Sequence, residues 1–460
     1  MNGRVLSVLI GSYLAERGGL PRLERLRHHR LREIVAFARQ RSPLYRELYR
    51  DLPEGVDEPT RLPITSKKAL MERFDDWITD REVKLQDVRH YIDQPDLIGQ
   101  LFLNKYIAAT TSGTTGVPGI FLLDTHNRAV TTAWSSRMFG GWLLEGGLLS
   151  ALLNGGRMAV VAATGAHFVV ATTTAAIQKG PFGKRVAIFP AQAPLSELVD
   201  HLNIFRPAIL SGYASLISLL AYEQEAGRLR ISPTIVMPGS EGLGVGDAER
   251  IAKTFNAVVR TAYVATECLF MASGCKHGWL HVNSDWAILE PVDADFRPAP
   301  PGVPSHTVLV SNLANRVQPV IRYDLGDSVL ERASLCPCGN PLPAIRVLGR
   351  TGELLKIQSP SGGFRMIAPL VLETVVDQVP GVKQFQLVQV APSVIRVRLA
   401  MDEKADPELT WRTVCVNLST FLSQQNAENI LIERATEPPE YIAGRKYRTV
   451  IPIGDVTTLK

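Results

Sequence analysis

Cysteine is scarce in this sequence. The 460 residues include five cysteines, and a small, odd number in a chain of this length does not make a disulfide framework. A secreted scaffold held by disulfides is therefore excluded, and we expect a reducing, cytoplasmic location. Cysteines that cluster in the fold are then candidate metal ligands.

Long hydrophobic runs are missing as well. The N-terminal MNGRVLSVLIGSYLAERGG has a short apolar run without the longer hydrophobic region and small-residue cleavage site of a signal peptide, so it predicts a helix. The most hydrophobic later stretch, residues 158–177, is interrupted by Gly165, His167 and a run of threonines, too often to cross a membrane. We predict buried strands there and no membrane partner.

Neither sign of charge dominates. Lysine and arginine together number 50, aspartate and glutamate 45, and the surplus is spread along the chain. Because nucleic-acid binding usually shows as a concentrated basic patch, we expect no nucleic acid partner. Phosphate and carboxylate ligands are compatible with this mild surplus.

What the sequence does contain is an alternation of strand-like and helix-like segments. Between about 100 and 330, short aliphatic runs such as RVAIFP and TIVMPG alternate with helical segments such as APLSELVDHLNIF. This alternation predicts an α/β fold with a mainly parallel sheet covered by helices. Ligands bind at the carboxyl ends of the strands in such sheets.

Three further segments, at 21–52, at 304–332 and after about 350, have patterns of their own. Residues 21–52 place apolar side chains at helical spacing among arginines and glutamates and predict amphipathic helices. Residues 304–332 predict a small β subdomain of hairpin-like strands, and the pattern restarts after about 350 with strands and a helix. We predict a large N-terminal domain over 1–349 and a small, mobile α+β domain over 350–460.

The stretch TTSGTTGVPG, residues 110–119, lies between two strand-like segments. Its glycines let backbone N–H groups turn inward, and the hydroxyls of Thr111, Ser112, Thr114 and Thr115 add donors, which makes a concavity suited to polyphosphate. It is not the P-loop consensus, because G-x-x-x-x-G-K-[ST] is absent. From this stretch alone, a phosphate loop and a solvated turn are equally good interpretations.

The stretch resembles the phosphate-binding loop of the adenylate-forming superfamily, which comprises acyl-CoA synthetases, adenylation domains and luciferases. Three later segments resemble further motifs of that superfamily in the same order: YVATE at 263–267, RYDLGD at 322–327 and LGR at 348–350. The N-terminal segment 37–70 is similar to the opening of the phenylacetate-CoA ligase branch in particular. The resemblance covers roughly residues 35–450 and is weakest in the tail.

The resemblance implies an enzyme that uses ATP and Mg²⁺ to activate a carboxylic acid as an acyl-adenylate and then transfers the acyl group, most simply to coenzyme A. Tyr263 would stack on adenine, Thr266 would approach the α-phosphate, and Glu267 would bind Mg²⁺. Asp327 would accept the ribose hydroxyls, and Arg350 would reinforce ribose or phosphate. The β- and γ-phosphates would be held by Thr111, Ser112, Gly113, Thr114, Thr115 and Gly116, and the adenine edge by Ser240 and Glu241.

A second set of residues has the chemistry of a zinc site. CKHGWLH puts Cys275 six residues before His281, and CPCG supplies Cys336 and Cys338. Three thiolates and an imidazole suit tetrahedral Zn²⁺. Scattered buried thiols are the other interpretation of the residues alone, but some phenylacetate-CoA-ligase-like proteins carry a similar set, so the resemblance favours a structural zinc. His277 is the alternative fourth ligand.

Three positions depart from the superfamily pattern. Its G-K-x-x-R-like tail segment reads GRKYR here, so the catalytic cation is Arg445 or, with a shift of one residue, Lys446, which we favour slightly. An arginine in place of a lysine is not a conservative change. Gly352 stands where an acidic hinge residue is usual, and Gly119 stands where many members have lysine.

The substrate and the acceptor follow from the resemblance only as classes. We expect an aromatic acid and coenzyme A. The changed tail motivates an alternative in which the acceptor is an amine, a carrier-protein thiol or another small nucleophile. A third hypothesis is a nucleotide-binding protein that has lost its chemistry. A homodimer stays open.

Overall fold

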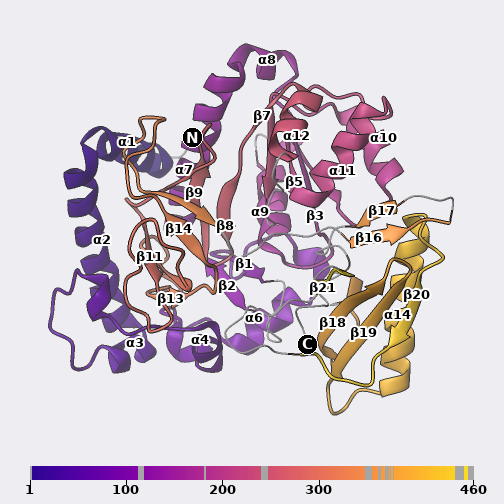
Figure 1. Ribbon diagram of the computed structural model, residues 1–460. Helices are drawn as coiled ribbons and strands as arrows, with labels where there is room; N and C mark the ends of the chain where they lie inside the picture. Colours follow the sequence, from indigo (N-terminus) through magenta and orange to yellow (C-terminus); the bar gives the residue numbers. More distant parts are fainter. Residues whose placement is uncertain are drawn as a thin grey trace.

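A computed structural model describes residues 3–111, 119–180, 183–239, 247–347, 355–360, 364–367, 372, 375–376, 378–440 and 450–453 (Figure 1). Within these residues, no helix combines the length and the apolar character that crossing a membrane requires.

Helices make up the N-terminal part of the chain. They are α1 (Gly3–Arg17), α2 (Gly19–Arg41), α3 (Pro43–Leu48), α4 (Lys67–Glu72), α5 (Phe74–Trp77) and α6 (Leu85–Ile92). The predictions of an N-terminal helix and of amphipathic helices over 21–52 are confirmed. Leu31, Ile34 and Ala38 lie on one face of α2 and are buried in a core with Trp77, as the apolar spacing requires. Short 3₁₀ helices lie at Pro59–Arg61, Pro95–Leu97 and Gly183–Arg185.

A five-stranded parallel sheet forms the centre of the large part. Its order is β4-β3-β5-β6-β7, with strands β3 (Met158–Ala162), β4 (Val186–Pro190), β5 (Ile209–Tyr213), β6 (Ile235–Gly239) and β7 (Val258–Val259). The helices between and beside them are α7 (Thr125–Gly146), α8 (Leu148–Leu153), α9 (Val169–Gln178), α10 (Leu195–Phe205), α11 (Ala214–Glu225) and α12 (Asp247–Phe255). The predicted α/β architecture is confirmed.

One prediction for this region is wrong in its second half. Residues 158–162 form a strand, but 169–178 form helix α9. Two parallel strands need a crossover connection, usually a helix, and α9 is that connection between β3 and β4. The threonine run tolerates a helix because the Thr173 hydroxyl donates to the Val169 carbonyl at 2.6 Å, one turn earlier.

Antiparallel strands pack beside the parallel sheet. One sheet has the order β14-β15-β10-β9-β8 and a second the order β11-β12-β13. Their strands are β8 (Ala262–Ala265), β9 (Cys268–Gly274), β10 (Leu280–Val282), β11 (Ala287–Val292), β12 (Thr307–Asn312), β13 (Tyr323–Asp324), β14 (Val329–Glu331) and β15 (Ala344–Val347). The predicted hairpin-like strands over 304–332 are confirmed, since β12 pairs antiparallel with β13.

The C-terminal part is α+β. It contains the hairpin β16 (Leu355–Gln358) and β17 (Phe364–Ile367), helix α14 (Pro407–Gln424), and a sheet of order β20-β19-β18-β21. The sheet strands are β18 (Val382–Ala391), β19 (Val394–Met401), β20 (Leu431–Arg434) and β21 (Val450–Ile451). The predicted boundary near 350 and most of the predicted helix at 368–379 lie outside the described residues.

The two parts share a hydrophobic core. Ile217 of α11, Leu355 of β16 and Ile367 of β17 belong to one cluster of buried side chains, and Figure 1 shows β16 and β17 beside the parallel layer. The apolar contact between α11 and the β16–β17 hairpin therefore holds the C-terminal part against the large one.

Candidate functional site

The ends of the predicted phosphate loop are held together. The flanking strands β1 (Ile107–Thr110) and β2 (Ile120–Leu123) pair antiparallel, which confirms the two strands predicted on either side of the loop. Thr111 is hydrogen-bonded to Gly119 at two points: its N–H donates to the Gly119 carbonyl at 2.9 Å, and its hydroxyl accepts from the Gly119 N–H at 2.8 Å. Ser112, Gly113, Thr114, Thr115 and Gly116 lie outside the described residues.

The side chains around Gly119 leave no room for a larger residue at this position. A Cβ atom at this position would lie 2.7 Å from the ring carbon Cε2 of Phe121 and 3.2 Å from Cδ of Lys67. A lysine at 119, as in many superfamily members, would therefore displace the phenylalanine ring. The side chain of Lys67, on the first turn of α4, therefore lies beside Gly119, at the end of the predicted phosphate loop. Sequence reasoning missed Lys67 because it lies 52 positions from Gly119.

Two of the predicted nucleoside-binding residues meet in the fold. The hydroxyl of Tyr263 on β8 donates to Oδ2 of Asp327 at 2.9 Å, and both residues are buried. Asp327 follows Gly326, whose φ of +73° is a conformation that favours glycine. Asp327 lies in the connection between β13 and β14, 64 residues after Tyr263 in the sequence. The aromatic face and the carboxylate needed for a nucleoside are thus adjacent.

Thr266 and Glu267 form the two-residue turn between β8 and β9, where Ala265 pairs with Cys268. Glu267 is 7% exposed. Its Oε1 accepts from the hydroxyl of Tyr323 at 2.9 Å. Its main-chain carbonyl accepts from the side-chain amide of Asn312 at 3.1 Å. A buried carboxylate oriented in this way has the chemistry of a ligand to a hard cation such as Mg²⁺.

Tyr323 is a second residue that sequence reasoning missed. It belongs to RYDLGD, of which only the aspartate at 327 was assigned a role. Burial, and then the Glu267 carboxylate, raise the pKa of Tyr323, so its hydroxyl remains a donor at neutral pH. Thr65 binds the same strand: its N–H donates to the Arg322 carbonyl, and its own carbonyl accepts from the Asp324 N–H, both at 2.9 Å. The start of α4, with Lys67, is thereby fixed beside β13.

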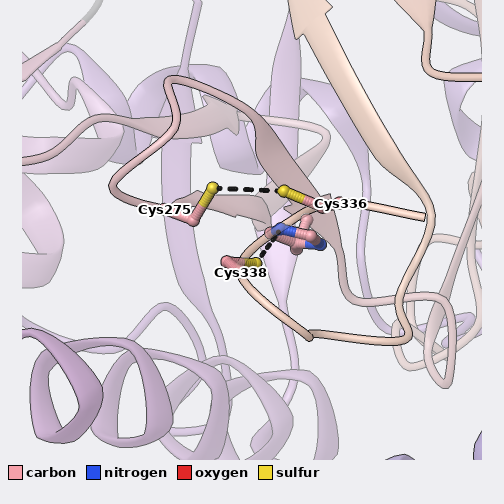
Figure 2. Close-up of side chains that lie close together, drawn as sticks. Cys275, Cys336 and Cys338 are labelled. Carbon is pink, nitrogen blue, oxygen red and sulfur yellow. Dashed lines mark hydrogen bonds between the residues drawn. The ribbon is translucent and has the colours of Figure 1, made fainter. Parts of the chain in front are cut away.

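The predicted zinc ligands come together. The ligand atoms of Cys275, His281, Cys336 and Cys338 all lie within 4.8 Å of one another. Figure 2 shows the three sulfurs pointing toward one another, with Sγ of Cys275 and Cys336 3.7 Å apart. Zn–S bonds of about 2.3 Å in a tetrahedron require sulfurs about 3.8 Å apart. His277 is exposed and does not belong to the cluster.

The histidine of the cluster is oriented for a metal. Nδ1 of His281 lies 3.1 Å from the Leu342 carbonyl, and Nε2 lies 3.1 Å from Sγ of Cys338. With Nδ1 donating to the carbonyl, Nε2 presents its lone pair to the three sulfurs, the usual arrangement of a ligating histidine. Burial lowers the pKa of His281, which keeps the ring neutral as a ligand must be. The donor set therefore fits zinc.

The remaining predicted site residues lie outside the described part of the chain. They are Ser240, Glu241, Arg350, Arg445 and Lys446. Gly352, at the predicted hinge, also lies there. Their roles stay predictions.

Comparisons with known proteins agree with this architecture. No model of a protein family matches the chain, and no curated protein matches it. Among solved structures, 2-hydroxyisobutyryl-CoA ligase in complex with 2-HIB-AMP and CoA in the thioesterification state has a TM-score of 0.58 at 21% identity, covering 95% of this chain and 91% of that one. The same ligase in the postadenylation state with 2-HIB-AMP has a TM-score of 0.54 at 21% identity, covering 94% and 90%. At 21% identity these likenesses show the fold: this chain has the fold of 2-hydroxyisobutyryl-CoA ligase over nearly its whole length.

Proposed function

We propose that this protein is an AMP-forming ligase: it uses ATP to activate a carboxylic acid as an acyl-adenylate and transfers the acyl group to coenzyme A. The observation that carries the proposal is the pair of tyrosine–carboxylate contacts on this fold. Tyr263 with Asp327 would supply a nucleoside site, and Tyr323 with Glu267 would supply a cation site. The complex of the ligase of similar fold with an acyl-adenylate and CoA supports both steps.

In the first step, a carboxylate oxygen attacks the α-phosphorus of ATP and pyrophosphate leaves. Asp327 would hold the ribose, and the Thr266 hydroxyl would donate to an α-phosphate oxygen as negative charge develops there. Glu267 would hold Mg²⁺, which supplies positive charge to the phosphate oxygens when bound. Arg445 or Lys446 would supply the second cation, from the C-terminal domain that begins near 350.

In the second step, the thiol of coenzyme A attacks the acyl carbon and AMP leaves. We propose that the C-terminal domain moves between the two steps, so that its cation serves adenylation and the thiol then enters from the same side. The acid is aromatic in our proposal, on the resemblance to the phenylacetate-CoA ligase branch.

Zinc would have a structural role. Cys275 follows β9, His281 lies on β10, and Cys336 and Cys338 lie between β14 and β15. With all four coordination positions filled by protein, no position is open for substrate. The metal would join the strand that follows the Thr266–Glu267 turn to the strand that follows Asp327.

The test is acid-dependent AMP formation with a panel of aryl and small aliphatic acids and three kinds of acceptor. We expect AMP and an acyl-CoA thioester with an aryl acid. Product with an amine or a carrier-protein thiol, and none with coenzyme A, would keep the adenylation and replace the acceptor. ATP binding without AMP formation for any acid would instead support a nucleotide-binding protein that has lost its chemistry.

A further inference from the structure

The connection between β12 and β13, residues 313–322, joins two parts of the candidate site. Both residues that flank it bind Glu267: the side-chain amide of Asn312 donates to the main-chain carbonyl at 3.1 Å, and the hydroxyl of Tyr323 donates to the carboxylate at 2.9 Å. Between these ends, the connection is hydrogen-bonded to β2, the strand that follows the predicted phosphate loop. One stretch of chain thus contacts both the proposed cation ligand and the hairpin that carries the loop.

Gln318, in this connection, binds β2 as a neighbouring strand would. Its Oε1 accepts from the Leu122 N–H at 2.6 Å, and its Nε2 donates to the Ile120 carbonyl at 2.9 Å. An adjacent strand binds alternate residues in this way. Within the described residues, β1 and β2 form a sheet of two strands, so Gln318 takes the place of a third. Ile120 directly follows Gly119, the end of the predicted phosphate loop.

Further contacts join the connection to β2. Nδ2 of Asn315 donates to the Leu122 carbonyl at 2.8 Å. Asp124, the residue after β2, accepts with Oδ2 from the N–H groups of Arg316 and Val317 at 2.8 and 3.1 Å. The connection is therefore bound to β2 along the length of the strand.

The connection is also tied by hydrogen bonds of its own. The Asn312 N–H donates to the Val320 carbonyl at 2.8 Å, and Oδ1 of Asn312 accepts from the N–H groups of Ala314 and Asn315 at 3.0 and 3.2 Å. The side chains of Asn312, Asn315 and Gln318 belong to residues at most 1% exposed. Because a network of buried, hydrogen-bonded amides holds one geometry, a shift of β2 is passed on to the turn between β8 and β9.

We propose that Gln318 and Asn312 are positioning residues for adenylation. Gln318 holds β2, Asn312 holds Glu267, and the connection between them fixes the cation ligand relative to the strand that follows the phosphate loop. This inference rests on the proposed function. A cation shared by Glu267 and the outer phosphates of ATP requires that separation to be fixed. Transfer to coenzyme A involves no outer phosphates and is spared.

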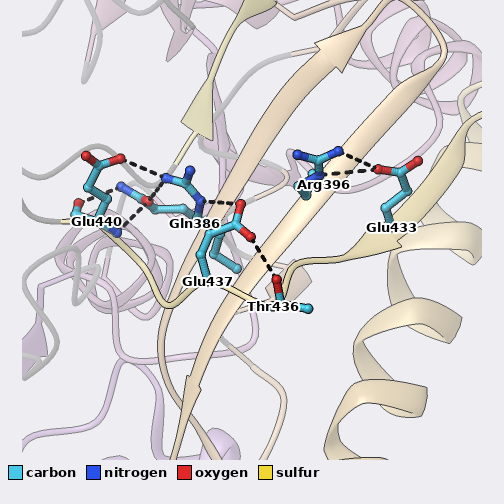
Figure 3. Close-up of polar contacts among 7 residues, drawn as sticks. Gln386, Arg396, Glu433, Thr436, Glu437 and Glu440 are labelled. Atoms are coloured by element: carbon cyan, nitrogen blue, oxygen red, sulfur yellow. Dashed lines mark hydrogen bonds and ion pairs between the residues drawn. The ribbon is translucent and has the colours of Figure 1, made fainter. Parts of the chain in front are cut away.

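Two other glutamines of this chain bind main chain in a similar way. Gln386 holds Glu440 at 3.0 and 2.9 Å in the C-terminal part, which is proposed to move during the reaction (Figure 3). Gln224, in the last turn of α11, holds Ile231: Nε2 donates to the carbonyl at 3.0 Å, and Oε1 accepts from the N–H at 3.2 Å. Since α11 starts at the carboxyl end of β5 and runs back along the sheet, Gln224 lies toward the end opposite to the one where ligands bind. Gln224→Leu is therefore the matched control for Gln318→Leu.

The kinetic experiment measures the two half-reactions separately in wild type, Gln318→Leu, Asn312→Ser and Gln224→Leu. Leucine at 318 has a similar volume without hydrogen bonds, and serine at 312 keeps an oxygen for the Ala314 N–H but loses the donor to the Glu267 carbonyl. We expect Gln318→Leu and Asn312→Ser to lower the kcat of acid-dependent pyrophosphate exchange about tenfold. Thioester formation from synthetic acyl-adenylate and coenzyme A should stay within about twofold of wild type, and Gln224→Leu should match wild type in both reactions.

The double variant tests whether the two contacts act through one link. Gln318→Leu and Asn312→Ser break opposite ends of the same connection, so pyrophosphate exchange in the double variant should be about tenfold below wild type rather than about a hundredfold. Losses that multiply would show two independent effects and overturn the inference.

A third experiment does not depend on any activity. Amide hydrogen exchange of the full chain without ligands, followed by mass spectrometry, reports local opening. We expect Gln318→Leu to speed amide exchange about tenfold in a peptide that spans 120–123, and about threefold in a peptide that spans the turn at 265–268. Gln224→Leu should change neither. If wild type shows no pyrophosphate exchange with any acid, the proposed function fails, and amide exchange alone decides whether the connection links β2 to the turn.

Three further results would overturn the inference. Pyrophosphate exchange within about twofold of wild type in folded Gln318→Leu or Asn312→Ser would show that the contacts do not position the site. An equal loss in both half-reactions would show a general structural role. Unchanged amide exchange at 265–268 in Gln318→Leu would show that no link exists. Should Gln318→Leu fail to fold, Asn312→Ser decides by the same measurements, with amide exchange then read at 120–123.

Discussion

The carboxylates of the proposed nucleotide site and those of residues 435–440, which follow β20, are held by different kinds of donor. Tyr323 donates to Glu267 and Tyr263 donates to Asp327, whereas Arg398 pairs with Glu437 and Glu440. A tyrosine hydroxyl orients a carboxylate without cancelling its charge, and an arginine does cancel it. The first arrangement suits a carboxylate that must bind a cation or a ribose, and the second suits one that anchors the chain.

The carboxylates held by tyrosine are also more deeply buried than those held by arginine. Glu267 and Asp327 are 7% and 5% exposed, while the side chains of Glu437 and Glu440 are 42% and 44% exposed. The geometry of the buried pair is therefore set by the surrounding strands, and solvent weakens the ion pairs of the other. The carboxylates of the proposed nucleotide site are therefore held more rigidly than those of residues 435–440.

The largest expected effect separates charge from geometry at Glu267. Glu267→Gln keeps an oxygen for the Tyr323 hydroxyl and removes the charge, so we expect the fold to remain and kcat for adenylation to fall about a hundredfold or more. Glu437→Gln makes the same change in residues 435–440 and should lower activity less than about threefold, because the ion pair of Arg398 with Glu440 remains. Steady-state kinetics and far-UV circular dichroism measure both, and equal effects would remove the distinction between the two regions.

The next effect concerns the cysteine cluster. Cys336→Ser should lower zinc content to below half an equivalent and the unfolding temperature by on the order of 10 °C, because three ligands hold zinc less well than four. Cys415→Ser, on α14 and outside the cluster, is the control and should change neither value. Metal analysis and thermal unfolding of the purified protein decide this, and a Cys336→Ser variant with full zinc content would contradict the site.

A smaller effect tests the tyrosine donors. Tyr323→Phe removes the donor to Glu267 and should lower kcat about tenfold while the KM for ATP changes little. Tyr263→Phe removes the donor to Asp327 and should mainly raise the KM for ATP, by severalfold. If the two variants have the same kinetic signature, the division into a cation site and a nucleoside site is wrong.

The smallest expected effect concerns Lys67, at the neck of the predicted phosphate loop. Lys67→Ala should raise the dissociation constant for ATP about fivefold and leave that for AMP unchanged, because AMP lacks the outer phosphates. Lys68→Ala is the control, since that side chain is 86% exposed and pairs with Glu72. Calorimetric titration with each nucleotide measures this, and an equal loss for ATP and AMP would exclude a contact with the outer phosphates.

The alternation of apolar segments and the order of the motifs predicted the main sheet and the cysteine cluster, but not every element. The alternation over 100–330 predicted the parallel sheet, and CKHGWLH with CPCG predicted the four clustered ligands. Helix α9 was missed because short apolar stretches do not distinguish a strand from a buried helix. Residues 169–178 form a helix because the parallel neighbours β3 and β4 need a crossover connection between them.

Tyr323, which donates to Glu267, and Gln386, which binds the main chain of Glu440, were also missed, for a common reason. Tyr323 and Gln386 act across 56 and 54 positions of sequence, and nothing in the residues around them indicates a partner at that distance. Tyrosine in a strand and glutamine in a strand are ordinary choices for packing. Their roles follow from strand register alone, which is a property of the fold.

The most direct test of the account is acid-dependent exchange of labelled pyrophosphate into ATP, measured for wild type and Glu267→Gln across aryl and small aliphatic acids. We predict exchange in wild type with one class of acid, dependent on Mg²⁺, and its loss in Glu267→Gln. Exchange that is as fast in Glu267→Gln as in wild type, or no exchange with any acid in a folded protein that binds ATP, would contradict it.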